Sequence, residues 1–553
     1  MNRKKFVSFI KKKLLLKTSK SVVLKGYTSK SETPTSITLL AIREIHKGTF
    51  ALLPSNLDLQ AHLEKYPLTD YGFKQDGGKI RSCNKNGTLG SYFDMEGLIH
   101  IIDLLSSIPA NNKDSISGDG FVSINSTIIR GYLRDYLCYL DYLILTNVIM
   151  VNGRYIPGKI SKGYKLTPQY EDGEPKVHHY RTDIKNIKAI QELVFNKETN
   201  CTQENQLINY NYLSHWYNQK KLTIDISKAR KYAYLLKEKK FNAGYENWDI
   251  NRDKWSKKRN YYCRKYPKTQ YVAAIHNIEA LEIHNYKAKI DTNEHRLHSV
   301  LTNIQKDYKP FIGYDGQPLV SIDITNSQPY LMNILFNPEF WKKNSTSPLS
   351  IYNLPPNIQS HITPLLSIMI GNYLEELDMD SLEEYRQKTS EGEIYEKIID
   401  IVQKRFGESL NRKQIKTMFY IVLFSKNGFF NQPDAKLKRL FKEIYPQVYE
   451  LTTILKTKNH ATLAILLQAI ESEIILHRCC KRVWEEGEQQ VPVFTIHDSI
   501  VTTKVNEDFV KKIMTEELAK AIGVPPTLQI EEWREDKLEH QDILIQINSQ
   551  KHE

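Results

Sequence analysis

Two aspartates stand at the ends of apolar segments, where a charged side chain is costly to bury. Asp323 ends the run LVSID, and Asp498 follows a histidine in VPVFTIHDSIVTT, Val491–Thr503. A carboxylate among apolar residues is unfavourable unless it is paired or bound to a metal. Two carboxylates that meet across a sheet could hold two divalent cations ~3.5–4 Å apart, which suits in-line displacement at phosphorus. Each aspartate taken alone is equally typical of a plain turn.

A third group of residues lies between these aspartates, in the segment NRKQIKTMFYIVLFSKNG. Arg412, Lys416, Tyr420 and Phe424 recur every four residues, which places them on one face of a helix. Cations at the start of such a face can hold a triphosphate, and aromatic rings at its end can stack on a base. An ordinary amphipathic helix with a basic edge would have the same spacing.

The order of the three motifs resembles the palm and fingers of single-subunit polymerases, the superfamily of family A DNA polymerases and phage-type RNA polymerases. In those enzymes the first motif is an aspartate that opens a strand-to-helix turn, as in DITNSQ. The second is R-x-x-x-K followed by aromatic residues, and the third is His-Asp, as in IHDS. The resemblance covers roughly Glu294 to the C-terminus, about half of the chain. The joint order is more specific than any single motif, and the chain would be a divergent member.

The resemblance implies a role for several residues of this chain. Asp323 and Asp498 would be the catalytic metal ligands for two Mg²⁺ ions, with Mn²⁺ as an alternative, and the backbone carbonyl of Ile324 would be a further ligand. The residues that bind the incoming nucleotide would be Arg412, Lys416, Tyr420, Phe424 and Gln328. The residues that bind the nucleic acid would be Arg296, Gln468 and His497, the last at the primer end.

Several positions depart from the family pattern. Ser425 follows the second motif where the family usually has glycine, and Phe424 lacks the hydroxyl of a tyrosine. Gln328 stands where the DNA enzymes have a glutamate that excludes a 2′-hydroxyl and the RNA enzymes have a small residue. Because Gln328 is bulky, it favours deoxynucleotides, whereas Ser499 after the second aspartate is more typical of the RNA enzymes. The preferred sugar therefore stays open.

The elements that must position these residues suggest a helix-rich α+β fold. The resemblance implies a right-hand polymerase, with a small antiparallel sheet in the palm and helical fingers and thumb, and the pattern ahead of it predicts a winged-helix-like domain. LVSIDI is predicted as a buried strand after the turn DGQP, and SQPYLMNIL as a helix with Ser327 near its start. The segment Val491–Thr503 is predicted as a buried hairpin with Asp498 at its tip.

The pattern divides the chain into four regions. Residues 1–112 are irregular and have no assigned role. Residues 113–172 are a winged-helix-like candidate for DNA binding, because a helical pattern through Leu145 precedes VIMV, NGR and an extended piece. Its wing would carry Arg154, Lys159 and Lys162, and a module used only for protein packing is the alternative. Residues 173–290 would form a helical thumb-like region, and residues 291–553 the palm and fingers.

Charge favours a polyanionic partner. The chain has 553 residues and a net charge of +13, and the stretch 227–270 interleaves basic and aromatic residues in a way typical of nucleic-acid contact. Six cysteines form no C-x-x-C pair, which argues against a zinc site or a disulfide framework. No apolar run reaches the ~18 residues of a membrane span. We expect a monomer in the cytoplasm, associated with a nucleoid or replicon.

The sequence thus predicts a template-directed nucleotidyltransferase in DNA replication, with a DNA-directed DNA polymerase favoured. It would use a DNA template-primer and dNTPs. No paired-acid pattern of a proofreading exonuclease precedes Ile290, so we expect no proofreading. A mobile element, plasmid or phage would suit such a compact enzyme. One alternative is an RNA polymerase or primase on the same scaffold, using NTPs or an RNA template-primer. The other is a catalytically inactive, DNA-binding replication initiator.

Overall fold

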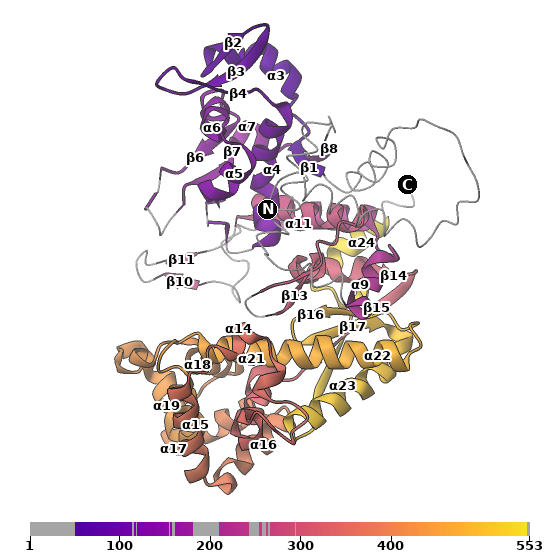
Figure 1. Ribbon diagram of the computed structural model, residues 1–553. Coiled ribbons are helices and arrows are strands. Elements are labelled where there is room, and N and C mark those ends of the chain that lie inside the picture. Colours follow the sequence, from indigo (N-terminus) through magenta and orange to yellow (C-terminus); the bar gives the residue numbers. More distant parts are fainter. Residues whose placement is uncertain are drawn as a thin grey trace, which may run out of the picture. The chain divides into compact units, whose positions relative to one another are not determined.

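The computed structural model describes residues 50–549, apart from 113–114, 118, 154, 157–160, 181–209, 243–253, 257–260, 264–265 and 293–294. These residues form a helix-rich α+β structure in which the strands of the sheets pair antiparallel (Figure 1). The fold class expected from the sequence is confirmed at this level. Among the described residues, no helix combines the length and the apolar character that a membrane span requires.

A six-stranded antiparallel sheet carries both candidate aspartates. Its strand order is β16 (Phe494–Ile496), β17 (Ser499–Thr503), β15 (Gln317–Ile324), β14 (Ile312–Tyr314) and β9 (Leu222–Ile224), and β18 (Leu528–Glu532) also pairs with β15. Strand β15 is central, with neighbours on both edges, so Leu319, Val320 and Ile322 are each no more than 1% exposed. The sheet includes β9, a strand from the segment that the sequence assigns to the thumb-like region.

The turns of this sheet form where the sequence predicts them. Asp315 and Gly316 join β14 to β15 with φ of 51° and 74°. The predicted hairpin consists of β16 and β17, and His497 and Asp498 form its two-residue turn. His497 has a φ of 55°, and such left-handed backbone is what tight hairpin turns require. Asp498 therefore lies at the tip of the hairpin, as expected.

Helices make up most of the chain after β15. The α-helices are α13 (Ser327–Leu331), α14 (Pro356–Gln359), α15 (Pro364–Glu376), α16 (Glu383–Ser390), α17 (Ile394–Phe406), α18 (Arg412–Phe424), α19 (Lys436–Ile444), α20 (Pro446–Leu455), α21 (Thr462–Ser472), α22 (Cys480–Glu486), α23 (Glu507–Ile522) and α24 (Gln541–Ser549). A π-helical segment, Glu473–Cys479, joins α21 to α22, so the two run as one continuous helix (Figure 1). The predicted helix at Ser327 is confirmed as α13, which passes into the 3₁₀ helix Met332–Phe336.

The N-terminal part of the described chain has a hydrophobic cluster of its own. Its elements are β1 (Phe50–Pro54), α3 (Leu59–Lys65), β2 (Phe73–Asp76), β3 (Lys79–Cys83), β4 (Leu89–Tyr92), α4 (Met95–Asn111), β5 (Val122–Ser123), α5 (Ser126–Tyr132), α6 (Tyr136–Leu145), β6 (Ile149–Val151), β7 (Gly163–Leu166), α7 (Pro168–Glu171) and β8 (Pro175–His179). The residues before Asn112, whose sequence pattern is irregular, nevertheless include the 17-residue helix α4. That helix is buried nearly all round, so it shows no polar face whose period would reveal it.

The winged-helix-like region contains the elements that its pattern suggests, with β5, β7 and β6 forming a three-stranded sheet. The assignment as a DNA-binding winged helix stays a prediction. Arg154 and Lys159 lie outside the described residues, whereas Lys162 precedes β7 and is exposed.

The segment between residues 210 and 303 is mixed rather than purely helical. It contains α9 (Asn211–Asn218), α10 (Ile226–Asn242), the hairpin β10 (Lys254–Ser256) and β11 (Tyr261–Cys263), α11 (Pro267–Glu282), the hairpin β12 (Lys289–Ile290) and β13 (Leu297–His298), and α12 (Val300–Asn303). In the basic and aromatic stretch, Tyr232 is fully buried. It therefore anchors α10 in the core and is not free to stack on a base, whereas Tyr234 is 47% exposed.

Candidate active site

The sheet brings the two predicted aspartates together. In the register of β15 and β17, Asp323 lies opposite Ser499, the residue that follows Asp498. Burial raises the pKa of the Asp323 carboxyl, and the neighbouring charge of Asp498 raises it further. Burial likewise raises the pKa of Asp498, while a hydrogen bond with Ser327 and the charge of Arg296 oppose that rise. Two acids from distant parts of the sequence thus share one partly buried corner of the sheet.

This corner fits a hard divalent cation. The described residues contain no group of three or more His, Cys, Asp or Glu side chains arranged to hold a metal ion. The donors that the sequence analysis expects at this corner are the two carboxylates and the backbone carbonyl of Ile324, the last residue of β15. Mg²⁺ is commonly bound through one or two carboxylates, with waters and substrate phosphates as its remaining ligands. Two acids that repel each other in a partly buried place are also the pair that a cation would stabilise.

Glu471 is a central residue of this site that the sequence analysis did not single out. It lies on α21 and is 1% exposed. Its carboxylate accepts hydrogen bonds from Arg296 Nη2 at 2.6 Å, Gln328 Nε2 at 3.0 Å and Ser327 Oγ at 3.4 Å. Burial raises the pKa of Glu471 to about 7; the charge of Arg296 opposes this rise, and that of Asp498 adds to it. An acid inside the apolar run TLAILLQAIES was the available sequence signal.

Of the three residues predicted to contact nucleic acid, Arg296 contacts this acid directly. Arg296 is 15% exposed and directs its guanidinium at Glu471, so in this structure it faces the protein. Gln468 stands on the same helix, three residues before Glu471, and is partly buried. His497 is exposed at the hairpin tip, and its ring centroid lies 6.4 Å from that of His298.

The helix predicted from the four-residue spacing is present as α18, which begins at Arg412 behind an Asn411–Gln414 capping box. Its binding of a nucleotide stays a prediction. The four-residue stripe lies on its outer side, because Arg412, Lys416 and Tyr420 are exposed and only Phe424 is half-buried. Tyr420 is 68% exposed, although its ring still contacts Phe424 at a centroid distance of 4.6 Å.

Tyr395 connects this stripe to the aspartates. Its ring lies 5.0 Å from the guanidinium carbon of Arg412 and 5.9 Å from Lys416 Nζ. Burial raises the pKa of Tyr395 to about 12, and the charge of Arg412 opposes this rise while that of Asp498 adds to it. Tyr395 therefore interacts with the cations of α18 and with the charge of Asp498, so the start of α18 and the hairpin tip lie near each other. Arg412 also forms an ion pair with Glu396.

Two buried lysines hold the C-terminal end of α18. Lys438 donates to Ser425 Oγ and to the carbonyl of Lys426, each at 3.0 Å. Lys456 donates to the carbonyls of Val422 and Ser425. These cations satisfy carbonyl groups that a helix end leaves without partners. The serine that departs from the family pattern is thus part of the cap, since its hydroxyl accepts from Lys438.

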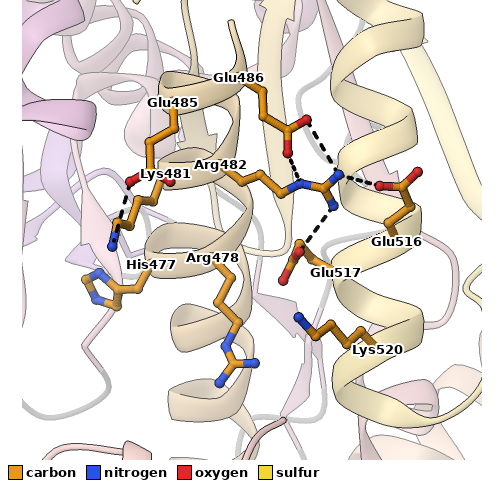
Figure 2. Close-up of a pocket in the computed structure, with 9 residues that line it drawn as sticks. All are labelled: His477, Arg478, Lys481, Arg482, Glu485, Glu486, Glu516, Glu517 and Lys520. Atoms are coloured by element: carbon orange, nitrogen blue, oxygen red, sulfur yellow. Dashed lines mark hydrogen bonds and ion pairs between the residues drawn. The ribbon is translucent and has the colours of Figure 1, made fainter.

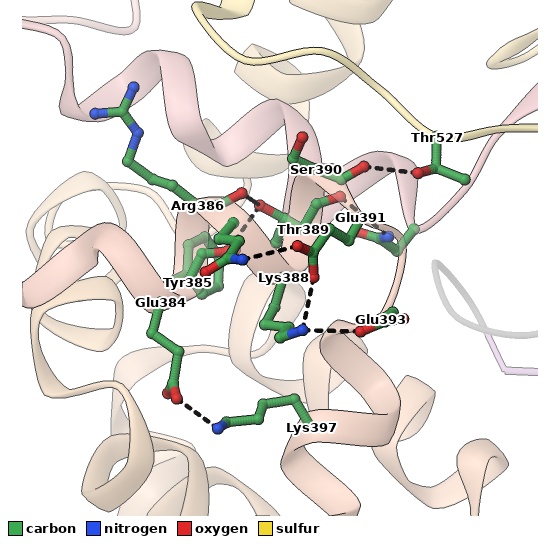
Figure 3. A network of polar contacts seen from close by, with 12 residues as sticks. Glu384, Tyr385, Arg386, Lys388, Thr389, Ser390, Glu391, Glu393, Lys397 and Thr527 are labelled. Carbon is green, nitrogen blue, oxygen red and sulfur yellow. Dashed lines mark hydrogen bonds and ion pairs between the residues drawn. The ribbon is translucent and has the colours of Figure 1, made fainter.

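A polar network around α16 includes Thr527, which also contacts the turn that follows Asp323; Figure 3 shows the contact between Thr527 and Ser390. Thr325 donates its backbone N–H to Thr527, and the Thr527 hydroxyl donates to the carbonyl of Ser390 at 2.8 Å. A side chain on Gly392 would place its Cβ 2.8 Å from Thr325 Cγ2, and Gly392 has a φ of 76°. Figure 3 also shows Lys388 held between Glu391 and Glu393. The loop after α16 therefore fits closely against the first motif and limits its freedom.

A separate pocket of about 660 Å³ contains none of the predicted site residues (Figure 2). It is lined by His477, Arg478, Lys481, Arg482, Glu485, Glu486, Glu516, Glu517 and Lys520. Arg482 of α22 donates to Glu516 at 2.5 Å and to Glu517 at 3.2 Å, both on α23. The acids and bases that line this pocket largely pair with one another and so link α22 to α23. The pocket therefore offers little net charge to a ligand.

The comparisons with known proteins add little to this geometry. No known protein family matches the sequence, and no curated protein matches it. Among solved structures, one that matches is the POL domain of Pol1 from M. smegmatis in complex with DNA primer-template and dNTP. The match has a TM-score of 0.32 and 10% sequence identity, and it covers 63% of this chain and 74% of that chain. Similarity at this level does not establish a relationship, so the function is argued from the site itself.

Proposed function

We propose that this protein is a template-directed nucleotidyltransferase, most simply a DNA polymerase that uses two divalent metal ions. The observation that supports it is the meeting of Asp323, on β15, with Asp498, in the hairpin turn that precedes the neighbouring strand β17. Tyr395 relates this pair to the helix that carries the exposed stripe of Arg412, Lys416 and Tyr420. Paired acids supply a metal site, and the stripe supplies the cations and the aromatic ring that a nucleoside triphosphate needs. A structural ion-pair network would not require an aromatic side chain that is 68% exposed, as Tyr420 is.

Each residue has a defined task in this proposal. Asp323, Asp498 and the Ile324 carbonyl would hold the metal ions. When bound, the ions would supply activation of the attacking hydroxyl and neutralisation of the leaving oxygen. Arg412 and Lys416 would bind the triphosphate and offset charge that develops in the transition state.

The contacts to base, primer and sugar complete the proposal. Tyr420 and Phe424 would pack on the nascent base pair, and His497, exposed at the hairpin tip, would contact the primer end. Gln328 would exclude a 2′-hydroxyl by its bulk, which favours dNTPs over NTPs. An RNA polymerase or primase would use the same acids and differ at this step.

Primer extension tests the proposal. A labelled primer on a DNA template is incubated with Mg²⁺ and either dNTPs or NTPs, beside the variants Asp323→Asn and Asp498→Asn. We expect each variant to lower the rate about 10³-fold or more, since the acids supply several kcal/mol through the metal ions. Asp315→Asn is the control, because Asp315 is an exposed turn residue of the same sheet, paired with Lys221.

The outcomes separate the alternatives. Template-dependent extension that needs both acids supports the polymerase, and the preferred nucleotide set distinguishes a DNA enzyme from an RNA enzyme. Extension that survives Asp498→Asn refutes the metal-ligand role. Tight duplex binding without any extension by the native chain favours the inactive initiator.

A further inference from the structure

Glu471 makes more contacts than an anchor for its helix needs. A buried carboxylate is costly unless an opposite charge and hydrogen bonds compensate it. The ion pair with Arg296, at 2.6 Å, would supply the opposite charge by itself. Yet two further donors reach the same group, Gln328 Nε2 at 3.0 Å and Ser327 Oγ at 3.4 Å. Both come from α13, the helix that begins directly after the turn behind Asp323.

Ser327 links Glu471 to the proposed metal site. Its hydroxyl donates to Glu471 Oε2 at 3.4 Å. The same hydroxyl lies close enough to Asp498 to favour the charged form of that carboxylate. Arg296, held by the other oxygen of Glu471, lies near enough to stabilise the charged form of Asp498. One carboxylate on α21 thus touches two residues that each act on the acid at the hairpin tip.

Glu471 lies within a long continuous helix, which can hold its side chain in a fixed position. Helix α21 continues through the π-helical segment Glu473–Cys479 into α22, and π-helical segments occur often at functional sites. Glu471 lies just before this segment. The neighbouring acid Glu473 faces a different partner, Arg478, at 3.6 Å. Two acids two residues apart on one helix therefore differ in whether they reach the site.

We propose that Glu471 is a positioning residue of the active site, which orients the Asp498 carboxylate through Ser327 and holds Arg296 and Gln328 beside the two aspartates. The inference rests on the proposed function and deepens it, because it names a residue outside the three motifs. Glu471 itself touches neither substrate nor metal in this role. The loss of an outer support of a metal ligand typically lowers activity or metal affinity by 10–100-fold, and about this much is expected here.

The substitution Glu471→Gln tests the idea with little change in shape. An amide would present N–H groups to Arg296, Gln328 and Ser327, which are themselves donors, so at least one contact must be lost. We expect kcat for single-nucleotide incorporation to fall about 10–100-fold, while KM for the nucleotide changes little. Glu471→Asp keeps the charge and should recover part of the rate. Glu473→Gln is the matched control and should leave kcat unchanged.

Ser327→Ala and the double variant show whether Glu471 acts through Ser327. If it does, the double variant is no slower than the slower of the two single variants. A second readout does not depend on activity, namely the rise in melting temperature that Mn²⁺ or Mg²⁺ produces. We expect this rise to be abolished by Asp498→Asn, reduced by Glu471→Gln and unchanged by Glu473→Gln.

Several results would overturn the proposal: an unchanged kcat and metal-induced shift in Glu471→Gln, multiplicative losses in the double variant, or an equal effect of Glu473→Gln. Absence of a metal-induced shift in the native protein would also overturn it. Failure of the proposed function is distinguishable. If the native chain incorporates no nucleotide but shows a metal-induced shift that Glu471→Gln reduces, the positioning role stands and the polymerase does not.

Discussion

Buried charges of both signs stabilise the residues that the proposed chemistry uses. Glu471 is 1% exposed and Lys456 is 3% exposed. Glu471 holds Arg296, Ser327 and Gln328 near the aspartates. Lys456 donates hydrogen bonds to carbonyl groups at the C-terminal end of α18. Each loses hydration on folding, and each recovers part of that loss through hydrogen bonds that only this arrangement of elements provides. Charged residues so placed stabilise one geometry at the expense of others.

Lys456 gives a prediction about pH. Burial, together with the neighbouring charge of Lys438, lowers its pKa from 10.5 to about 7 in the folded protein. Between these values the unfolded chain binds a proton that the folded chain does not. Stability should therefore rise with pH across this window, and the full cost of burying the amine applies below its lower end. The contribution is at most about 1.4 kcal/mol per pH unit.

Melting temperatures measured across that window check this prediction. The native protein should gain more stability with rising pH than Lys456→Met, which has no proton to bind. Lys458→Met is the control, because Lys458 is exposed two residues away. Parallel pH profiles for the native protein and Lys456→Met would contradict the lowered pKa.

At the scale of elements, the sequence predicts best those features whose signal is local. The strand before Asp323, the His497–Asp498 hairpin and α18 each show in a short run of residues, and each is confirmed. The sequence analysis did not identify Glu471 as a site residue, because its role depends on contact with Arg296, which lies 175 positions away in the chain. The same limit applies to β9, whose place in the sheet depends on its pairing with β14.

Some elements gave no readable pattern for a different reason. Helix α4 is buried on nearly every side, and short strands such as β5 hold too few residues to show alternation. The cap of α18 was seen only as a departure at Ser425. Its cause lies in Lys438 and Lys456, which belong to other segments of the chain. Tertiary contacts of this kind have no periodic signature along the sequence.

The stripe on α18 makes a prediction about one helix face. Lys416→Ala should raise KM for the nucleotide about 10–100-fold, since a hydrogen bond to a charged group contributes about 1.5–3 kcal/mol. Lys413→Ala is the matched control. Lys413 is a lysine of the same helix that lies about 60° from Lys416 around the helix axis, and it does not belong to the four-residue series. Steady-state incorporation kinetics measure both. Equal effects of the two substitutions would indicate a generally basic edge.

At the scale of the whole chain, two hydrophobic clusters meet along one strand. Phe50 and Leu52 of β1 belong to the larger cluster, which contains the sheet with both aspartates, and Ala51 belongs to the N-terminal cluster. Alternate residues of a strand face opposite sides, so β1, paired with β8, contributes to both cores. Asn277 of α11 also donates to the carbonyl of Ala110 at 3.1 Å. The N-terminal part is therefore built onto the core that carries the site.

The charge of the whole chain leads to the last prediction. The sequence has 77 Lys and Arg against 64 Asp and Glu, a net charge of +13. If this excess serves nucleic-acid binding, association with a primer-template duplex releases counterions, and the logarithm of the affinity falls linearly with the logarithm of the salt concentration. A footprint of about 6–10 phosphates would lower the affinity about 10³–10⁵-fold between about 50 and 200 mM salt.

Fluorescence anisotropy with a labelled duplex measures this slope. Asp498→Asn should bind with the same slope as the native protein, because in the proposed function Asp498 binds a metal ion and contacts no phosphate. This separates binding from chemistry, since the variant should bind and yet fail to extend the primer. An affinity that does not depend on salt would mean that the positive charge is a general property of the surface. The polymerase proposal would then rest on the aspartates and the α18 stripe alone.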